Sequence, residues 1–562
     1  MYRKLIVSAL GISAIAAAGL LILDTGGPQD RDLLRHVPAD TVFYNGYSDP
    51  NLPLAELVDM WGPMGKMSRQ QAQAIDPSAA TEQAGPAGGV MAGLYKQYLI
   101  SMAEDEYPLK RFGISRENVA ATYAVGALPV MRVSLGDPEA FWQRLDAIEE
   151  TAGVDAANGK QRRYAFDTES DQRQLDLLVT SNDGYAILTL AGSGIDDSAI
   201  DLAVGASRPE TSLDDSGRLD ELAQRHGTLP AATGFLDHQA LAAGLTGASD
   251  DRFASMLAQL VTTWGGDDAG LGAIRNNACQ QDFATIAEQW PYTSVGITRL
   301  DTNTRELGTR VSMAVPDDGL RSKLTGLRGH IPDPVDKRPI AGLGLGLRGD
   351  SFASTVQDLA RAFTGSDFQC KPLQQAQRQL RNQPLNQLGM ATAMISDVRG
   401  IAAAITDLQQ GRTGPLPVQP SAVVEVATPK PTALWQFAQQ SLGLPADTRP
   451  EAGGDPVSVD MPMVRGINLR VAIRDNALVA LTGNAELDAA AGESDTEPNG
   501  VMSLRYDYGR IAAAIAEQVP GNAATLPEQE VLEAIDVYYD MRLDITDQGL
   551  QMDMDIAPAP ED

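Results

Sequence analysis

The chain has 562 residues, more than one hydrophobic core ordinarily organises, so its length predicts at least two domains. Its 74 Asp and Glu exceed its 44 Lys and Arg and give a formal net charge of -30. A charge of this size repels phosphate backbones and excludes sequence-independent binding to nucleic acid. With only 4 histidines and 2 cysteines, the chain is poorly supplied for metal clusters, and we predict no metal site and no cofactor.

The N-terminus has the pattern of a membrane-targeting segment. Arg3 and Lys4 precede an uncharged run over residues 5–23. As a helix this run would be about 28 Å long, close to the roughly 30 Å hydrocarbon thickness of a bilayer. The basic flank favours the cytoplasmic side and sends the rest of the chain outward. We therefore predict a signal anchor over 1–23, in contact with the bacterial inner membrane through residues 5–23, and a linker over 24–35. A cleaved signal peptide and a secreted periplasmic protein are the alternative, since Ala16–Ala18 suits cleavage.

The two cysteines, Cys279 and Cys370, predict a disulfide if the body of the protein lies outside the cytoplasm. The chain-entropy model gives a bridge of this spacing roughly 4 to 5 kcal/mol of stabilisation. Two unrelated buried thiols are the alternative.

Two parts of the chain match at an offset of 293 residues. The offset separates Val130 from Val423, Pro138 from Pro431 and Trp142 from Trp435. In both copies an alternating strand leads into a helix that begins with proline. We therefore predict a tandem duplication, with a first repeat over 36–331 and a second over 340–562. The first repeat carries predicted insertions at 62–112 and 195–229, of which 62–90, rich in Gly, Ala, Gln and Pro, is expected to be mobile.

Three aspartates stand where a predicted strand gives way to a predicted helix: Asp237, Asp397 and Asp507. Aliphatic residues follow each of them at the fourth and eighth positions, which places those residues on one helical face. An aspartate at this place is a typical helix N-cap. Capping explains all three residues, so we predict no catalytic residue among them.

The C-terminal residues alternate between apolar and charged side chains, as in Tyr539, Met541 and Leu543 against Asp540 and Arg542. This alternation is typical of a hairpin whose apolar face is packed and whose charged face is wet. The predicted fold class is therefore α+β, with a mainly antiparallel sheet covered by helices on one face and built twice.

Few chemical motifs are present. The glycines at 344, 346 and 349 match a dinucleotide fingerprint, but no acidic residue ends a second strand about 20 residues later, so we interpret them as a strand packed closely on a helix. Acidic pairs such as Asp196–Asp197 and Asp250–Asp251 lack the order of a calcium loop, and weak calcium binding stays an alternative.

Several of these features resemble a family of uncharacterised bacterial exported proteins, a domain-of-unknown-function family. The resemblance covers mainly residues 36–245. It is carried by the segments VPADT at 37–41, DPEAFWQRL at 137–145, NDGYAILTLAGS at 182–193 and SLDDS at 212–216. The resemblance implies export and a duplicated α+β fold, and it implies no catalytic residue.

These observations favour a non-enzymatic envelope protein, a membrane-anchored periplasmic scaffold that binds another envelope protein. The alternative is a carrier that holds a hydrophobic ligand or lipid between its repeats or behind a sheet. A hydrolase with a site assembled from distant residues is the least favoured hypothesis.

Overall fold

The computed structural model describes most of the chain. The described residues are 31–49, 64–104, 109–155, 159–167, 174–265, 271–335, 337–383, 396–410, 418–444, 448–459, 468–487, 496–511 and 537–558. The predicted membrane segment over 1–23 lies outside them. Within these ranges, no helix combines the length and the apolar character that crossing a membrane requires.

The chain forms two compact units. Unit 1 extends to Ala314 and also contains Phe368–Pro372, whereas unit 2 contains Val315–Asp367 and the chain from Leu373 onward. The sequence predicted a boundary between 331 and 340 instead. Part of that range packs on the unit 2 sheet, where Arg505 Nη1 donates to the carbonyl of Val335 at 2.7 Å.

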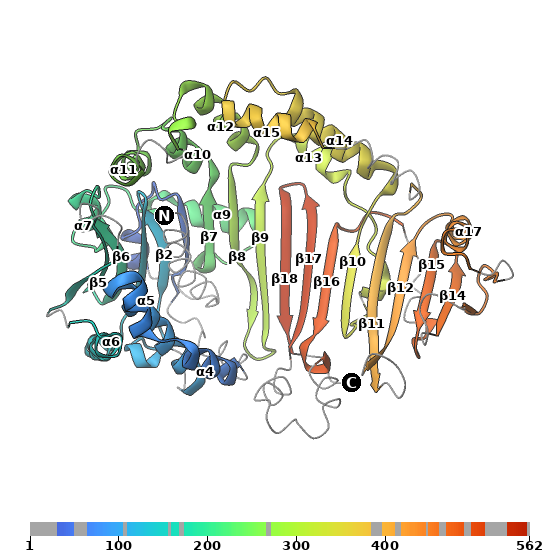
Figure 1. Cartoon of the computed structure of the whole chain (residues 1–562), viewed down its shortest axis with the longest axis horizontal. Helices are drawn as coiled ribbons and strands as arrows, with labels where there is room; N and C mark the ends of the chain where they lie inside the picture. Colours follow the sequence, from blue (N-terminus) through green and yellow to red (C-terminus); the bar gives the residue numbers. More distant parts are fainter. Residues whose placement is uncertain are drawn as a thin grey trace. The chain divides into compact units, whose positions relative to one another are not determined.

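The part of unit 1 that the structure describes contributes nine strands, each antiparallel to its neighbours (Figure 1). The spatial order is β4-β5-β6-β3-β2-β1-β7-β8-β9. The strands are β1 (Phe43–Tyr47), β2 (Ala120–Val125), β3 (Leu128–Ser134), β4 (Gln161–Ala165), β5 (Leu175–Asn182), β6 (Tyr185–Gly192), β7 (Thr233–Asp237), β8 (Tyr292–Asp301) and β9 (Glu306–Ala314).

The described strands of unit 2 are also antiparallel to their neighbours and have the same spatial order, β13-β14-β15-β12-β11-β10-β16-β17-β18. Its strands are β10 (Ala341–Leu345), β11 (Gly400–Gln410), β12 (Val418–Ala427), β13 (Val457–Val459), β14 (Leu469–Arg474), β15 (Ala477–Thr482), β16 (Met502–Asp507), β17 (Tyr538–Thr546) and β18 (Gly549–Ala557). The predicted α+β class with antiparallel pairing is confirmed. Each strand of unit 2 also takes the position that its counterpart takes in unit 1.

Helices cover both faces of the unit 1 sheet. One apolar core joins Leu178, Ile187 and Phe235 to α2, α7, α8 and α9, and a second joins Leu177 and Val179 to α5 and α6. The prediction of helices on one face is therefore wrong for unit 1, where strands such as β5 are apolar on both sides. The helices are α2 (Arg31–Arg35), α4 (Met64–Ala74), α5 (Pro77–Glu104), η1 (Lys110–Phe112), α6 (Pro138–Ala152), α7 (Asp197–Ala203), α8 (Leu213–Ser216), α9 (Arg218–His226), η2 (Pro230–Ala232), α10 (His238–Thr246), α11 (Arg252–Leu260), η3 (Val261–Gly265), η4 (Leu271–Ala273) and α12 (Asn277–Gln289).

The helices described in unit 2 are fewer. They are α13 (Asp318–Thr325), η5 (Asp333–Val335), α14 (Gly349–Gly365), α15 (Lys371–Arg381) and α17 (Pro431–Leu442). The first two residues of α15 fall in the part of the chain assigned to unit 1. Both α6 and α17 begin at proline, as the repeated sequence predicted.

Two predictions for the N-terminal half are wrong. The linker predicted over 24–35 ends before α2, because Leu33 and Leu34 are buried in the core. Within the region 62–112, predicted as an insertion that is mobile over 62–90, residues 64–74 form α4 and residues 77–104 form α5. The N–H groups of Ser78 and Ala79 donate to Asp76, which caps α5. Unit 2 also has helices, α14 and α15, between its first two strands. Helices at this place are therefore common to both units, and the region is not an insertion.

The region 195–229 forms α7, α8 and α9 between β6 and β7. The corresponding connection in unit 2 spans only residues 483–501, between β15 and β16. This difference in length supports the interpretation of 195–229 as an insertion.

The unit 2 sheet has an apolar face that the described helices leave largely uncovered, and we call it the open face. It consists of two rows of cross-strand partners across six strands. The rows are Val424, Ala403, Leu343, Leu504, Met541 and Met554, and Val426, Ile401, Leu345, Met502, Leu543 and Met552. Figure 1 shows β10, β16, β17 and β18 with no described helix in front of them. The prediction of a packed apolar side was made for the hairpin of β17 and β18, where Ile545 and Ile556 on that side are buried and Arg542 and Asp555 on the charged side are exposed.

Candidate functional site

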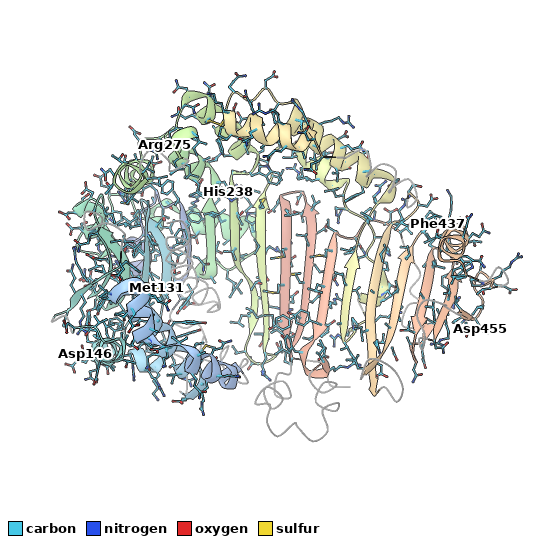
Figure 2. The ribbon with its side chains drawn as sticks, viewed as in Figure 1. Met131, Asp146, His238, Arg275, Phe437 and Asp455 are labelled. Carbon is cyan, nitrogen blue, oxygen red and sulfur yellow. A yellow bond between two sulfur atoms is a disulfide. The ribbon has the colours of Figure 1, made fainter. Side chains whose placement is uncertain are left out.

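Unit 1 contains an apolar cavity between α5 and the face of the sheet that α5 covers. Its volume is about 130 Å³, and it is partly open. The strands β1, β2, β3 and β6 form the floor, and α5, η1 and the start of α6 complete the wall. The lining residues are Asn45, Gly46, Tyr47, Leu94, Tyr95, Tyr98, Leu109, Phe112, Ile114, Ala120, Ala121, Thr122, Met131, Val133, Phe141, Ala186 and Leu188. Met131, labelled in Figure 2, projects from the central strand β3.

The position of α5 over the sheet follows from its small residues. Gly85 has a φ of 80°, which L side chains rarely adopt, and it kinks the helix just before Pro86. Further along, a Cβ at Gly93 would lie 2.4 Å from Ile148 Cγ2 of α6. Glycine therefore lets α5 lie against α6, while Leu94 and Tyr98, one turn apart, face the cavity.

The polar groups of the cavity are few and uncharged. The hydroxyl of Tyr47 donates to Asn118 Oδ1, so it is already paired inside the protein. Asn45 and Thr122 are neighbours on β1 and β2 and supply an amide and a hydroxyl to the floor. Tyr95, whose side chain is exposed, lies at the rim.

Among the described residues that line the cavity, none carries a carboxylate, amine, imidazole or thiol. Its buried tyrosines stay protonated at neutral pH, because burial raises the pKa of Tyr98 to about 12 and that of Tyr47 further still. These groups offer no general acid or base near pH 7. The arrangement can hold a ligand, and it contains no acid–base pair with which to transform one.

The size and lining of the cavity suit an aliphatic chain. An apolar cavity of roughly 150 Å³ admits benzene, so a cavity of this size accepts a small ring or the end of an alkyl chain. Because the cavity opens outward, a longer ligand can leave its polar end beyond the rim. Burying alkyl surface there would contribute about 0.8 kcal/mol per methylene.

The predicted disulfide is confirmed: Cys279 and Cys370 are bonded, with their Cα atoms 4.4 Å apart. Asp282 Oδ2 also accepts the N–H groups of Gln369 and Cys370, both at 2.7 Å. The bond therefore holds Phe368–Pro372 on α12 of unit 1, and neither cysteine is among the described cavity-lining residues.

Two of the three predicted N-caps are present. Asp237 accepts the N–H of Ala240 at 2.9 Å at the start of α10, and Asp507 accepts the N–H of Arg510 at 2.9 Å. Both are structural residues that the cavity does not include.

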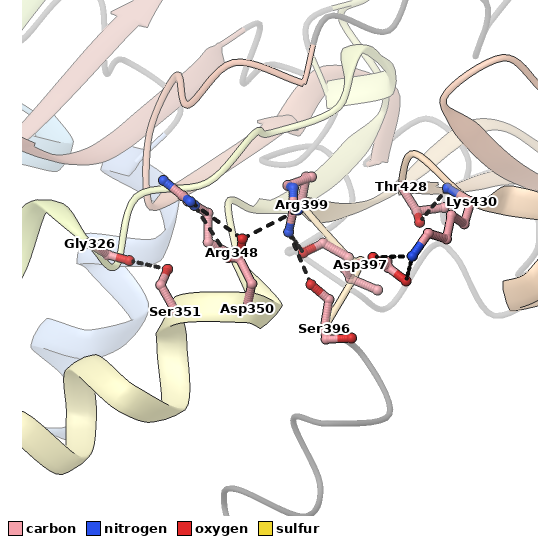
Figure 3. A network of polar contacts seen from close by, with 10 residues as sticks. Gly326, Arg348, Asp350, Ser351, Ser396, Asp397, Arg399, Thr428 and Lys430 are labelled. Carbon is pink, nitrogen blue, oxygen red and sulfur yellow. Dashed lines mark hydrogen bonds and ion pairs between the residues drawn. The ribbon is translucent and has the colours of Figure 1, made fainter.

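The prediction for Asp397 is wrong, because a strand and not a helix follows it. Residues 400–410 form β11, which pairs with β10 and β12 on its two sides. The carboxylate of Asp397 instead binds Lys430 Nζ at 3.0 Å and 3.1 Å (Figure 3). Gly400 also favours this arrangement, since a Cβ there would lie 1.6 Å from the His330 carbonyl oxygen.

The glycines at 344 and 346, which matched a dinucleotide fingerprint, allow neighbouring segments to pack closely on β10 and the residue that follows it. A Cβ at Gly344 would lie 2.4 Å from Ile331 Cγ2, and one at Gly346 would lie 2.2 Å from the Gly500 carbonyl oxygen. Beside it, Asp350 binds Arg348 and Arg399 (Figure 3). Although burial opposes the shift, these arginines lower the pKa of Asp350.

The acidic pairs also have structural roles. Asp196 caps α7 by accepting the N–H of Ser198, and Asp251 caps α11 by accepting that of Ala254. Among the residues that the structure describes, no group of three or more His, Cys, Asp or Glu could hold a metal ion.

Sequence reasoning offered a hydrophobic site behind a sheet as an alternative, but it did not identify the residues that line the cavity. Its signal was divided between the alternating residues of β3, whose Met131 and Val133 face α5, and the Gly- and Ala-rich run at 77–104. The pattern of that run indicated a loop more strongly than a helix. Searches against family models, curated proteins and solved structures found no match for this chain.

Proposed function

We propose that this protein is a non-enzymatic, extracytoplasmic binding protein that holds an aliphatic chain in the cavity of unit 1. The observation that carries the proposal is the cavity itself: an open, uncharged, apolar space between a helix and a sheet. The tandem duplication fits this view, because both units have the same strand order and, among the described helices, a helix such as α5 covers this sheet face in unit 1.

The disulfide supports an extracytoplasmic location, since such bonds persist in oxidising compartments. An anchor or signal peptide over 1–23 would deliver the chain there, at the inner membrane. The ligand class follows from the lining, which offers two uncharged polar residues, Asn45 and Thr122, together with tyrosine hydroxyls. A neutral amphiphile with one alkyl chain matches this chemistry better than a fatty acid, whose carboxylate would find no cation in the lining.

Titration with 1-monolauroylglycerol, followed by calorimetry, tests the proposal. The Ala120→Phe variant puts a ring into the cavity and should weaken binding at least about tenfold, the loss expected when roughly two methylenes are displaced. Ala147→Phe is the matched control, because Ala147 is exposed on α6 and outside the cavity. Equal affinity of the two variants for the probe would contradict the proposal.

A partner-binding scaffold is the second candidate. The uncovered apolar surface of unit 2 favours it, since contiguous exposed apolar surface marks interaction sites. Cross-linking in intact cells would test this candidate, and a partner held at that surface in place of a lipid would support it over ligand carriage.

A further inference from the structure

On β10, β11, β12 and β16, the open face is more exposed than the opposite side of the sheet, which is the reverse of an ordinary sheet. Leu343 and Leu345 of β10 are 44% and 42% exposed, and Val424 of β12 is 39% exposed. On the opposite side of the sheet, Glu425 of β12 and Ser503 of the neighbouring strand β16 are each only 2% exposed. A one-sided sheet normally buries its apolar side and exposes its polar side. An exposed apolar surface of this extent usually marks a site where another molecule binds.

Pairing register shows which positions of unit 1 correspond to the open face. In unit 1, Asn45 pairs with Thr122, which pairs with Met131. In unit 2, Leu343 pairs with Ala403, which pairs with Val424. Met131 and Val424 are also separated by the repeat offset of 293 residues.

The next row corresponds in the same way. Tyr47 pairs with Ala120, and Ala120 with Val133, whereas Leu345 pairs with Ile401, and Ile401 with Val426. The floor of the unit 1 cavity therefore recurs on the open face.

The copy in unit 2 is more apolar than the original. The two polar floor residues of the cavity, Asn45 and Thr122, correspond to Leu343 and Ala403. The rows also continue into Met502, Met541 and Met552 on the strands beyond β10. Methionine side chains are flexible and polarizable, and they adapt to ligands of variable shape.

We propose that the open face is a second binding surface for the aliphatic chain of a neutral lipid, an inference that rests on the function proposed for unit 1. Two observations favour this occupant over others. The face repeats the floor of a cavity whose lining suits an alkyl chain, and it carries no charged residue to pair with a charged partner.

The net charge of the whole chain also favours a neutral lipid as the occupant. A net charge of -30 repels both an anionic bilayer surface and a second copy of the chain. A single neutral chain meets no such repulsion, and it gains apolar contact along both rows.

Photo-crosslinking in the purified full chain tests the inference. Benzoylphenylalanine replaces Leu343 on the open face, Tyr95 on the cavity rim, or Arg542 on the opposite side of β17 as the control. Each variant is irradiated with 1-monolauroylglycerol below its micelle concentration and weighed intact. We expect about tenfold more lipid adduct at 343 than at 542, with the adduct at 343 retained when Ala120→Phe is added.

The two labelled positions separate failure of the inference from failure of the proposed function. An adduct at 95 without one at 343 overturns the inference and leaves the cavity proposal standing. An adduct at 343 without one at 95 overturns the cavity proposal. Equal labelling at 343 and 542, loss of the adduct at 343 with Ala120→Phe, or a cross-link from 343 to a second copy of the chain overturns the inference.

Discussion

Arg132 and Glu425 are separated by the repeat offset of 293 residues and occupy corresponding positions on β3 and β12. Both are buried, at 0% and 2% exposure. Arg132 Nη1 and Glu425 Oε2 each have no hydrogen-bond partner among the described residues. One position of the repeat thus holds a buried cation in unit 1 and a buried acid in unit 2, and each has a consequence that can be measured.

Glu425 makes the stability of unit 2 depend on pH. Burial, aided by Asp333, raises the pKa of Glu425 from 4.5 to about 8. The folded chain therefore keeps a proton that the unfolded chain releases, and stability falls as pH rises from about 4.5 to 8. The slope is at most about 1.4 kcal/mol per pH unit. Amide hydrogen exchange of β12 at pH 5 and pH 8 measures this loss.

Glu425→Gln should remove most of that pH dependence, whereas Glu486→Gln, at an exposed position of the same unit, should leave it intact. An unchanged slope in Glu425→Gln would show that Glu425 is not the titrating group.

The charge of Arg132 helps to lower the pKa of His36 in unit 1. Burial first, and then the charge of Arg132, lower the pKa of His36 from 6.5 to about 4. Arg132→Met should therefore raise this pKa part of the way toward 6.5, since the burial remains. An NMR titration of the His36 ring measures the change, with Arg132→Lys as the control that keeps the charge. A pKa that is the same in all three proteins would contradict the assignment.

The sign of the His36 effect is opposite to that of Glu425. Because the folded state holds His36 neutral, its contribution to stability is complete above pH 6.5 and is lost as pH falls toward 4. Because Arg132→Met raises the pKa of His36 in the folded state, it should narrow the pH range over which stability is lost.

A buried ion pair secures α6 on the sheet. Glu149, fully buried, binds Arg162 Nη1 at 2.8 Å and accepts the hydroxyl of Tyr164 at 2.6 Å. Glu149→Ala should lower the free energy of unfolding by about 3 kcal/mol, because it removes the buried partner of Arg162 and leaves only Asp146, which binds Arg162 Nη2 at 2.6 Å. Urea denaturation measures the loss. Glu221→Ala, which breaks the exposed pair with Arg225, should cost less than about 1 kcal/mol. Similar losses in both variants would contradict the role given to burial.

The disulfide closes a long loop, with Cys279 and Cys370 separated by 91 positions. Its reduction should lower the stability of unit 1 by about 2 to 5 kcal/mol. Denaturation with and without reductant measures the effect, and the Cys279→Ser/Cys370→Ser double variant should show none of it. A response of the double variant to reductant would point to another cause.

Features that depend on local chemistry could be predicted from the sequence. Asp237 and Asp507 cap helices because a short polar side chain at a strand-to-helix junction reaches the free N–H groups. The 293-residue offset indicated a repeated plan because proline and tryptophan recur at a fixed spacing.

Features that depend on residues far away in the sequence could not be predicted from it. Residues 401–405 have helical spacing, yet they pair between β10 and β12, and their neighbours outweigh the local pattern. The exposure of Leu343 depends on which helices cover which unit, and alternation alone carries no such information. The residues that line the cavity could not be identified for the same reason, since they come from several distant segments.

The central claim is that an aliphatic chain occupies the cavity between α5 and the unit 1 sheet. Its most direct test is an NMR experiment on methyl-labelled protein that detects contacts between the protein and the alkyl chain of 1-monolauroylglycerol. The account predicts intermolecular signals from Met131 and Leu188, on β3 and β6, and their loss in Ala120→Phe. Signals absent from both methyl groups at saturating probe would contradict it.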